Sequence, residues 1–122
     1  MSVIVVGYSA KPEGAAALDR AIAEAELRDS SIIVVHTLSE DSEITDLAER
    51  LAQSGRQHQI RVAPDPLDPA EEVLASADRS NADFIVIGLR RRSPVGKLLL
   101  GSNAQRVLLD AQCPVMAVKA DS

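Results

Sequence analysis

The 122-residue chain has little of what several classes of protein depend on. It has a single cysteine, so it cannot form an internal disulfide, and such sparse use of cysteine is typical of a reducing compartment. Aromatic residues make up 2% of the sequence and tryptophan is absent, so no stacking platform for single-stranded nucleic acid is expected. No uninterrupted apolar run approaches the ~18 residues that a membrane-spanning helix requires.

An excess of positive charge is also missing. The chain carries 13 Lys and Arg against 18 Asp and Glu, a net charge of −5, whereas general binding to nucleic acid or to an anionic membrane requires a basic surface. The N-terminal residues include neither a basic segment nor the long apolar core of a signal peptide. We therefore expect a cytoplasmic protein that has no nucleic-acid or membrane partner.

What the sequence does contain is the composition of an ordinary globular protein, with 46% hydrophobic and 25% charged residues. Its length fits one domain over residues 1–122, large enough to bury a core. Five short apolar segments predict strands, and the third alternates with polar residues, which places it nearer a sheet edge. These segments are Val3–Val6, Ile32–Val35, Gln59–Ala63, Phe84–Ile87 and Val115–Val118.

Between the strands, apolar residues recur at the spacing of amphipathic helices. Four helices are predicted: one opening at Pro12, one over Ser39–Gly55, one opening at Pro69 and one following Ser102. Asp68 and Ser102 are expected to be N-cap residues, because Asp and Ser side chains accept hydrogen bonds from the N–H groups of a first helical turn. A Glu or Gln three residues after each would complete a capping box.

This alternation of strands and helices implies right-handed βαβ crossovers. The predicted fold class is therefore α/β: a Rossmann-like, doubly wound, five-stranded parallel sheet with helices on both faces. Ligands of such sheets bind at the carboxyl ends of the strands, where the strand order reverses. The pattern does not give the strand order, but it gives the strand ends, which fall at Gly7–Ser9, His36-Thr37, Ala63–Asp65 and from Gly88 onward.

The most informative stretch is the loop Gly88–Ser102, between the fourth predicted strand and the fourth helix. Glycines let a backbone approach a ligand closely, and the N–H groups at a helix N-terminus attract anions. Four of the 13 basic residues also lie in this loop, although the protein as a whole is acidic. These are Arg90, Arg91, Arg92 and Lys97. The sequence therefore predicts a phosphate site here.

Other candidate chemistry is weaker. His36 follows a strand, but no serine or cysteine nucleophile stands at a recognisable spacing from it, so we predict no catalytic residue. Asp65 and Asp68 suggest a metal pair, yet turn and cap chemistry accounts for both, and no metal site is predicted. Cys113 is interpreted as a small buried hydrophobe.

An ordered set of motifs resembles the universal stress protein family over essentially the whole chain. That family's nucleotide signature, Gly-x2-Gly-x9-Gly-Ser/Thr, is matched at Gly88, Gly101 and Ser102, and the later Cys113-Pro114-Val115 also matches. The resemblance implies an adenine nucleotide alpha hydrolase-like fold with strand order 3-2-1-4-5. It also implies a homodimer formed through the last strand and, as in many members, ATP bound between the first and fourth strands.

The chain departs from that family at three positions. Arg91 replaces the second glycine of the signature, Ser9 stands where ATP-binding members carry an aspartate, and Leu67 replaces the glycine of a Gly-Asp-Pro turn. A glycine at position 91 would let the backbone approach a phosphate, whereas an arginine adds a cation. ATP binding is therefore implied by the resemblance but not assured by it.

The resulting hypothesis is a stress-response binding module that takes ATP or another phosphate-bearing adenine nucleotide. The expected cofactor-binding residues are Ser9, Gly88, Arg90, Arg91, Gly101, Ser102 and Asn103. In this arrangement the glycines and the N–H groups around Ser102 meet the phosphates, the two arginines neutralise charge, and Ser9 meets the ribose. Two alternatives remain open: a nucleotide-free dimeric interaction module, and a slow ATP hydrolase, although no general base or water-positioning residue is recognisable.

Overall fold

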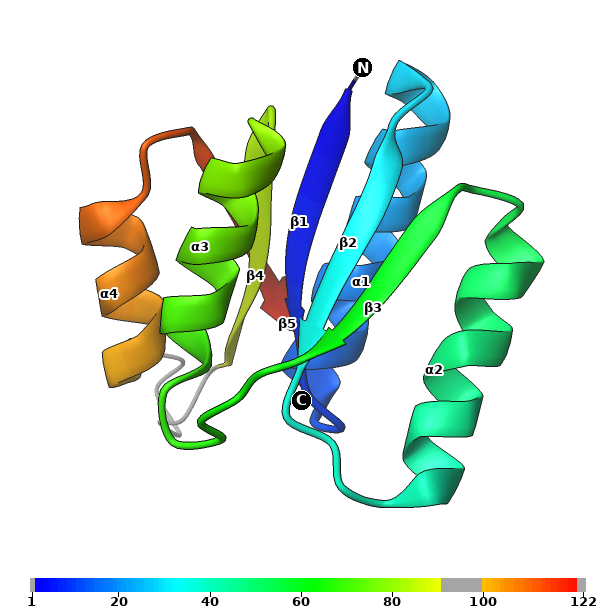
Figure 1. Cartoon of the computed structure of the whole chain (residues 1–122), viewed down its shortest axis with the longest axis horizontal. Coiled ribbons are helices and arrows are strands. Elements are labelled where there is room, and N and C mark those ends of the chain that lie inside the picture. The colour runs from blue at the N-terminus through cyan, green and yellow to red at the C-terminus, as the bar shows by residue number, and fades with distance from the viewer. Residues whose placement is uncertain (1, 91–99, 121–122) are drawn as a thin grey trace.

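The computed structural model describes residues 2–90 and 100–120. Its centre is a five-stranded sheet in the order β3-β2-β1-β4-β5, and every pair of neighbouring strands is parallel (Figure 1). The strands are β1 (Val3–Tyr8), β2 (Ser31–His36), β3 (His58–Val62), β4 (Phe84–Arg90) and β5 (Val115–Ala120). The predicted α/β class, the strand order 3-2-1-4-5 and the edge position of the third strand are confirmed.

Helices cover both faces of the sheet, with α1 and α2 on one face and α3 and α4 on the other (Figure 1). Their bounds are α1 (Pro12–Arg28), α2 (Asp41–Ser54), α3 (Pro69–Ser80) and α4 (Ser102–Asp110). None of these helices is both long and apolar enough to cross a membrane. The positions of Pro12 and Pro69 at the helix starts agree with the prediction, because the first helical turn tolerates proline.

The core is split into two clusters by the sheet. Ile4 and Val6 of β1 pack on the α1 side, whereas Val5 between them packs on the α3 side, and all three are fully buried. Because both faces of the central strands are covered, these strands are apolar at successive positions instead of alternating with polar residues. The full burial of β1 agrees with its central position in the sheet. Its parallel pairing with β2 and β4 brings the carboxyl ends of the three strands to the same edge.

The N-terminus of α4 differs from the prediction by one residue. Its N-cap is Gly101, not Ser102. Gly101 has the extended backbone (φ −68°, ψ 165°), and its carbonyl accepts the first helical hydrogen bond from the N–H of Gln105 at 3.0 Å. The Gln105 side chain completes no capping box, since its amide donates to the carbonyl of Leu100 at 3.1 Å. Within the described part of the chain, no side chain caps the first turn of α4.

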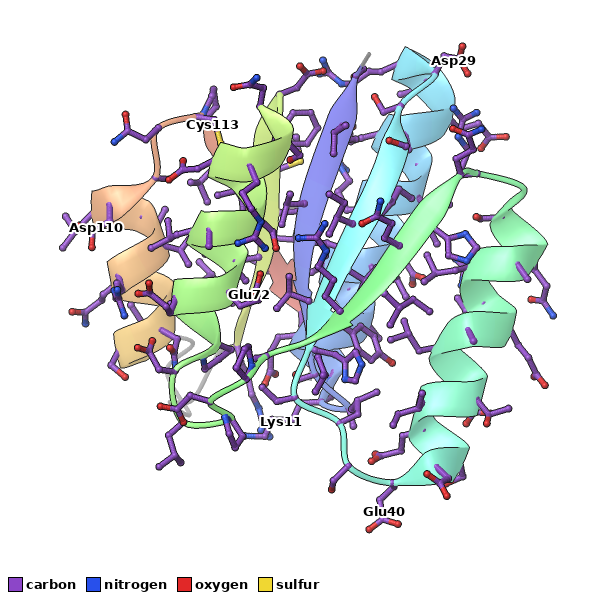
Figure 2. All side chains as sticks on the ribbon, viewed as in Figure 1. Lys11, Asp29, Glu40, Glu72, Asp110 and Cys113 are labelled. Atoms are coloured by element: carbon purple, nitrogen blue, oxygen red, sulfur yellow. The ribbon has the colours of Figure 1, made fainter. Side chains whose placement is uncertain are left out.

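The strand order determines where a ligand site can form. The chain passes from β1 to β2 through α1 on one face and from β3 to β4 through α3 on the other, so the connections diverge at the β1–β4 pair. A crevice opens at this position in doubly wound sheets. The strands end at the lower edge of the sheet in Figure 1, the edge near which Figure 2 labels Lys11, the residue before α1.

Candidate functional site

A cavity of about 170 Å³ lies at the carboxyl ends of β1, β2 and β4, between the first turn of α1 and the two helices α3 and α4. Its most buried lining residues are apolar: Val35, Ala70, Val73, Ile87 and Val107. Its half-buried lining residues include the polar residues Tyr8, Ser9, Glu13, Thr37 and Asn103. An apolar interior with a few polar groups at its margin is typical of small-molecule sites.

Two glycines allow α1 to reach this cavity. A Cβ atom on Gly88 would lie 1.9 Å from the carbonyl oxygen of Glu13, and one on Gly14 would lie 2.2 Å from the carbonyl oxygen of Ser9. Such distances are far inside van der Waals contact, so neither position accepts a side chain without movement of the backbone. Gly88 was predicted as part of a phosphate loop, and the structure shows that it also permits α1 to pack on β4. Gly14 was not predicted, although a glycine within a helix is the signal that marks it.

Asn103 connects the two helices that line the cavity. Its Oδ1 accepts a hydrogen bond from the N–H of Ala70, in the first turn of α3, at 3.3 Å. Asn103 therefore satisfies an N–H group that an N-cap side chain would otherwise bind. With the oxygen so engaged, the group that Asn103 presents to a ligand is its NH2, which is a hydrogen-bond donor.

Four charged residues form the Arg106 clasp (Arg106, Asp68, Glu71 and Asp110), which holds α4 against α3 through Asp68 and Glu71. The Nη1 of Arg106 donates to both carboxylate oxygens of Asp68, at 2.9 and 2.7 Å. The Nη2 of Arg106 donates to Glu71, and its Nε lies 3.7 Å from Asp110, labelled on α4 in Figure 2. The hydrogen bonds to Glu71 and then Asp68 raise the pKa of Arg106 above its usual range.

The clasp corrects the prediction for the start of α3. Asp68 is the N-cap residue, as expected, but its side chain makes no capping hydrogen bond. The carboxylates of Asp68 and Glu71 both bind Arg106, so the predicted capping box does not form. The guanidinium is a stronger partner because it offers charged donors in a planar fork that matches a carboxylate. The outcome is a link between helices where the sequence indicated a local cap.

The strand ends also place Tyr8 and His36, which are paired in the register of β1 and β2. The Nδ1 of His36 accepts a hydrogen bond from the N–H of Leu38 at 3.0 Å, and burial lowers the pKa of this histidine. His36 does not line the cavity, which agrees with a structural role. Tyr8 does line it, but its side chain packs against the cluster on the α1 side of the sheet, where burial, with a smaller effect of nearby carboxylates, raises the pKa of its phenol.

The predicted site residues divide into three groups. Ser9, Gly88 and Asn103 line the cavity together. Arg90 at the end of β4, and the exposed Gly101 and Ser102 at the start of α4, are not among its lining residues. Arg91 lies outside the described residues, as do Arg92 and Lys97. Of the lining residues that the site prediction omitted, Thr37 had been recognised only as a strand end, and Glu13 carried no signal beyond its place in a helical first turn.

A larger, open groove of about 760 Å³ lies at the opposite end of the strands, beside β3. Three arginines line it, but each contacts groups within the protein. Arg56 and Arg79 bind Asp29 and Glu72 at 2.8 and 2.7 Å. Arg61 donates to the side chain of Gln59 at 2.9 Å. The cavity at the β1–β4 end is therefore the better candidate for a ligand site.

The fold and this cavity define a class of protein: a doubly wound α/β domain with a candidate ligand site at the reversal of strand order between β1 and β4. The sequence profile of the universal stress protein family matches residues 38–119. The chain belongs to the universal stress protein family. A universal stress protein from Mycolicibacterium smegmatis is 44% identical over 127 residues, which cover 96% of this chain and 97% of the relative.

Solved structures are similar along nearly the whole chain. A universal stress protein from Archaeoglobus fulgidus has a TM-score of 0.74 and 30% identity, and the match covers 98% of both chains. A structure of the universal stress protein from the same organism in complex with dAMP has a TM-score of 0.69 and 25% identity, again covering 98% of both chains. The resemblance deduced from the glycine and Cys-Pro-Val motifs is thus confirmed.

Proposed function

We propose that this universal stress protein is a stress-response module that binds an adenine nucleotide, ATP or another phosphate-bearing form, in the cavity between β1 and β4. The observation that carries the proposal is the cavity itself, which brings Ser9, Gly88 and Asn103 together beneath an apolar wall. The relative from Archaeoglobus fulgidus in complex with dAMP supports the same class of ligand.

The size of the cavity suggests how the nucleotide is divided between interior and rim. At about 170 Å³ it is smaller than the ~300–1,000 Å³ of pockets that enclose a whole drug-sized ligand. An adenine ring therefore occupies the apolar part, against Val35 and Val73, and the remainder of the nucleotide extends toward the rim. The faces of the flat adenine ring are weakly hydrated, so their contact with an apolar wall is favourable.

The phosphate is assigned to the side of the cavity formed by α4. The Asn103 NH2 donates there, and the first-turn N–H groups at Ser102 and Asn103 carry the positive end of the helix dipole. Gly88, near the end of β4, lines the opposite side of the cavity, where α1 packs on the strand. Arg90 and Arg91 are proposed to neutralise charge near the phosphate, and Ser9 to meet the sugar.

The decisive variant is Asn103→Asp. An aspartate still accepts the hydrogen bond from the N–H of Ala70, so α3 stays capped, but it replaces the donor NH2 with a negative charge beside the phosphate. Calorimetric titration with AMP, ADP and ATP should show affinity reduced by roughly tenfold or more, since one charge-assisted hydrogen bond is lost and a repulsion is gained. Asn81→Asp is the matched control, because it adds the same charge at the exposed end of α3.

The outcomes separate the competing functions. Binding by the unaltered protein that Asn103→Asp weakens and Asn81→Asp does not would support the proposal. If none of the three nucleotides at millimolar concentration raises the melting temperature of the unaltered protein, the nucleotide-free interaction module becomes the better description.

We also infer a homodimer formed through β5, the strand at the free edge of the sheet beside β4. An edge strand carries unpaired backbone N–H and C=O groups, which a second copy of the same strand satisfies. Met116 and Val118 are partly buried apolar residues of this strand. Light scattering at micromolar concentration should give the mass of a dimer and, for Val118→Lys, that of a monomer. A monomer in the unaltered protein would contradict the inference.

A further inference from the structure

Glu13, in the first turn of α1, has a carboxylate whose burial requires an explanation. The residue lines the cavity and is half-buried as a whole. Its Oε2 is withdrawn from solvent and has no hydrogen-bond partner among the residues that the structure describes. An anionic oxygen that loses its hydration without gaining a partner destabilises the folded state. Such atoms are rare in native proteins and mark strain, function or a missing ligand.

The helix dipole does not account for this oxygen. A carboxylate in a first turn is stabilised by the positive end of the helix, but an exposed glutamate would gain the same benefit. The first-turn glutamates of α3 do have partners. Glu71 accepts a hydrogen bond from Arg106, and Glu72 accepts hydrogen bonds of 2.7 Å from Ser76 and from Arg79. Glu13 alone among these first-turn glutamates has a buried oxygen with no described partner.

The backbone of Glu13 is held in place from two sides. Its carbonyl oxygen lies so close to Gly88 that a Cβ there would approach to 1.9 Å, and its own Cβ would be 2.9 Å from that atom. The next residue, Gly14, is packed equally closely against Ser9. The backbone of Glu13 therefore cannot retreat from the cavity without unpacking α1 from β4, and the residue stays at the wall opposite α4.

We infer that Glu13 is a specificity-determining residue that selects a ligand with hydroxyl donors, namely the pentose of the adenine nucleotide. This inference rests on the proposed function. An ionised carboxylate only accepts hydrogen bonds, and phosphate oxygens at neutral pH do the same, so the two groups repel and the phosphate lies away from Glu13. With the base against the apolar wall and the phosphate at α4, the pentose joins them and presents its hydroxyls to Glu13.

The experiment compares AMP with 2′,3′-dideoxy-AMP, which keeps the base and phosphate but lacks both pentose hydroxyls. Calorimetric titrations use the unaltered protein, Glu13→Gln and Glu13→Ala. Glu26→Gln serves as the matched control, because Glu26 is an exposed glutamate on the same helix. The unaltered protein and Glu26→Gln should bind AMP roughly tenfold more tightly than the dideoxy form, the fold-change expected for one hydrogen bond to a charged group. Glu13→Ala should bind the two equally.

Glu13→Gln keeps a neutral acceptor oxygen, so it should retain part of the preference for AMP over the dideoxy form. Because its side chain has nearly the same shape as glutamate, it also serves as the test variant should Glu13→Ala fail to fold. Four results would overturn the inference. Discrimination that survives in both Glu13 variants would show that the hydroxyls bind elsewhere. Equal gains in affinity for both ligands would show that Glu13 only repels phosphate. Binding of AMP by the unaltered protein without discrimination leaves the proposed function intact and removes this inference. No binding of AMP also removes this inference, and no binding of AMP, ADP or ATP removes the proposed function as well.

Discussion

The two walls of the cavity are built by different physical means. On one side the first turn of α1 is held by backbone packing at Gly14 and Gly88, and the helix behind it spans 17 residues with six buried. On the other side α4 has nine residues, of which only Val107 is buried, and it is held by the Arg106 clasp and Asn103.

This difference indicates that the α1 wall is the more rigid of the two and the α4 wall the more adjustable. Packing of backbone against backbone depends on shape, so it responds little to salt. Hydrogen bonds between exposed charges are screened by salt over about 8–10 Å at near-physiological ionic strength. We therefore expect the α1 wall to set the shape of the site and the α4 wall to adjust around the ligand.

The largest effect, a loss of stability, is expected from Gly88→Ala, which disturbs the packing of the α1 wall. The added Cβ would lie 1.9 Å from the carbonyl oxygen of Glu13, so α1 must shift from β4, and overpacking of this kind costs about 3 kcal/mol. Urea denaturation would measure the loss of unfolding free energy. Gly101→Ala is the control, because no atom of the described residues lies within 4 Å of its Cβ position. Its change should stay within about 1 kcal/mol, the scale of an N-cap substitution. Equal stability of the two variants would contradict the packing argument.

A smaller and more local effect, faster opening of α4, is expected from Arg106→Gln, which removes the central residue of the clasp on the α4 wall. Removing the guanidinium frees Asp68 and Glu71, so α4 should open more often while the rest of the sheet stays protected. Hydrogen exchange should show several-fold faster exchange in α4 and no change in α1. Added salt should have the same effect on the unaltered protein.

Arg79→Gln provides the control for the clasp, because it removes an arginine of α3 that pairs with Glu72 of the same helix and lines the groove at the opposite end of the strands. It should leave exchange in α4 unchanged. If α4 is as protected in Arg106→Gln as in the unaltered protein, the apolar contact of Val107 is sufficient and the contrast between the two walls disappears.

The smallest effect is expected from acid and concerns His36, on the α1 side of the sheet end. Burial lowers the pKa of His36 in the folded protein, so protonation is easier in the unfolded chain, where the pKa is about 6.5. The stability that depends on neutral His36 is therefore complete above pH about 6.5 and is lost as pH falls below that value toward the lowered folded pKa.

Thermal unfolding between pH 7.5 and roughly 5 would test this, because histidine titrates there and most carboxylates do not. His36→Gln should flatten the pH dependence, whereas His58→Gln, a substitution at an exposed histidine, should leave it unchanged. A pH dependence that persists in His36→Gln would assign it to other groups.

Much of the fold could be predicted because its signals are local. Continuous apolar runs such as Val3–Val6 arise from burial on both faces of a strand, and Gly55 ends α2 with φ 71°, a conformation that glycine adopts without strain. The left-handed residues that end α1 and α3, Asp29 and Asn81, were not predicted. Asp and Asn adopt the left-handed conformation only occasionally, whereas glycine adopts it routinely, so an Asp or Asn in the sequence is a weaker indication of a helix end.

The candidate site was predicted in part for the same reason. Gly88 and Ser9 were found because they follow strands, and strand ends share one edge of a parallel sheet. Gly101 and Ser102 were expected beside them, yet they belong to an exposed helix start outside the cavity lining. Glu13 was not among the predicted site residues, since its burial depends on how closely α1 approaches β4.

The sequence alone determined the order of elements, the fold class and the family, because periodicity, strand ends and motif spacing are properties of neighbouring residues. Tertiary structure alone decided which distant residues meet. Arg106 binds Asp68 across 38 positions, and Asn103 caps α3 at Ala70 across 33. In each case the local signal indicated another partner, a capping hydrogen bond or a phosphate. Packing brought a distant group within reach, and a hydrogen bond forms with the partner that geometry supplies.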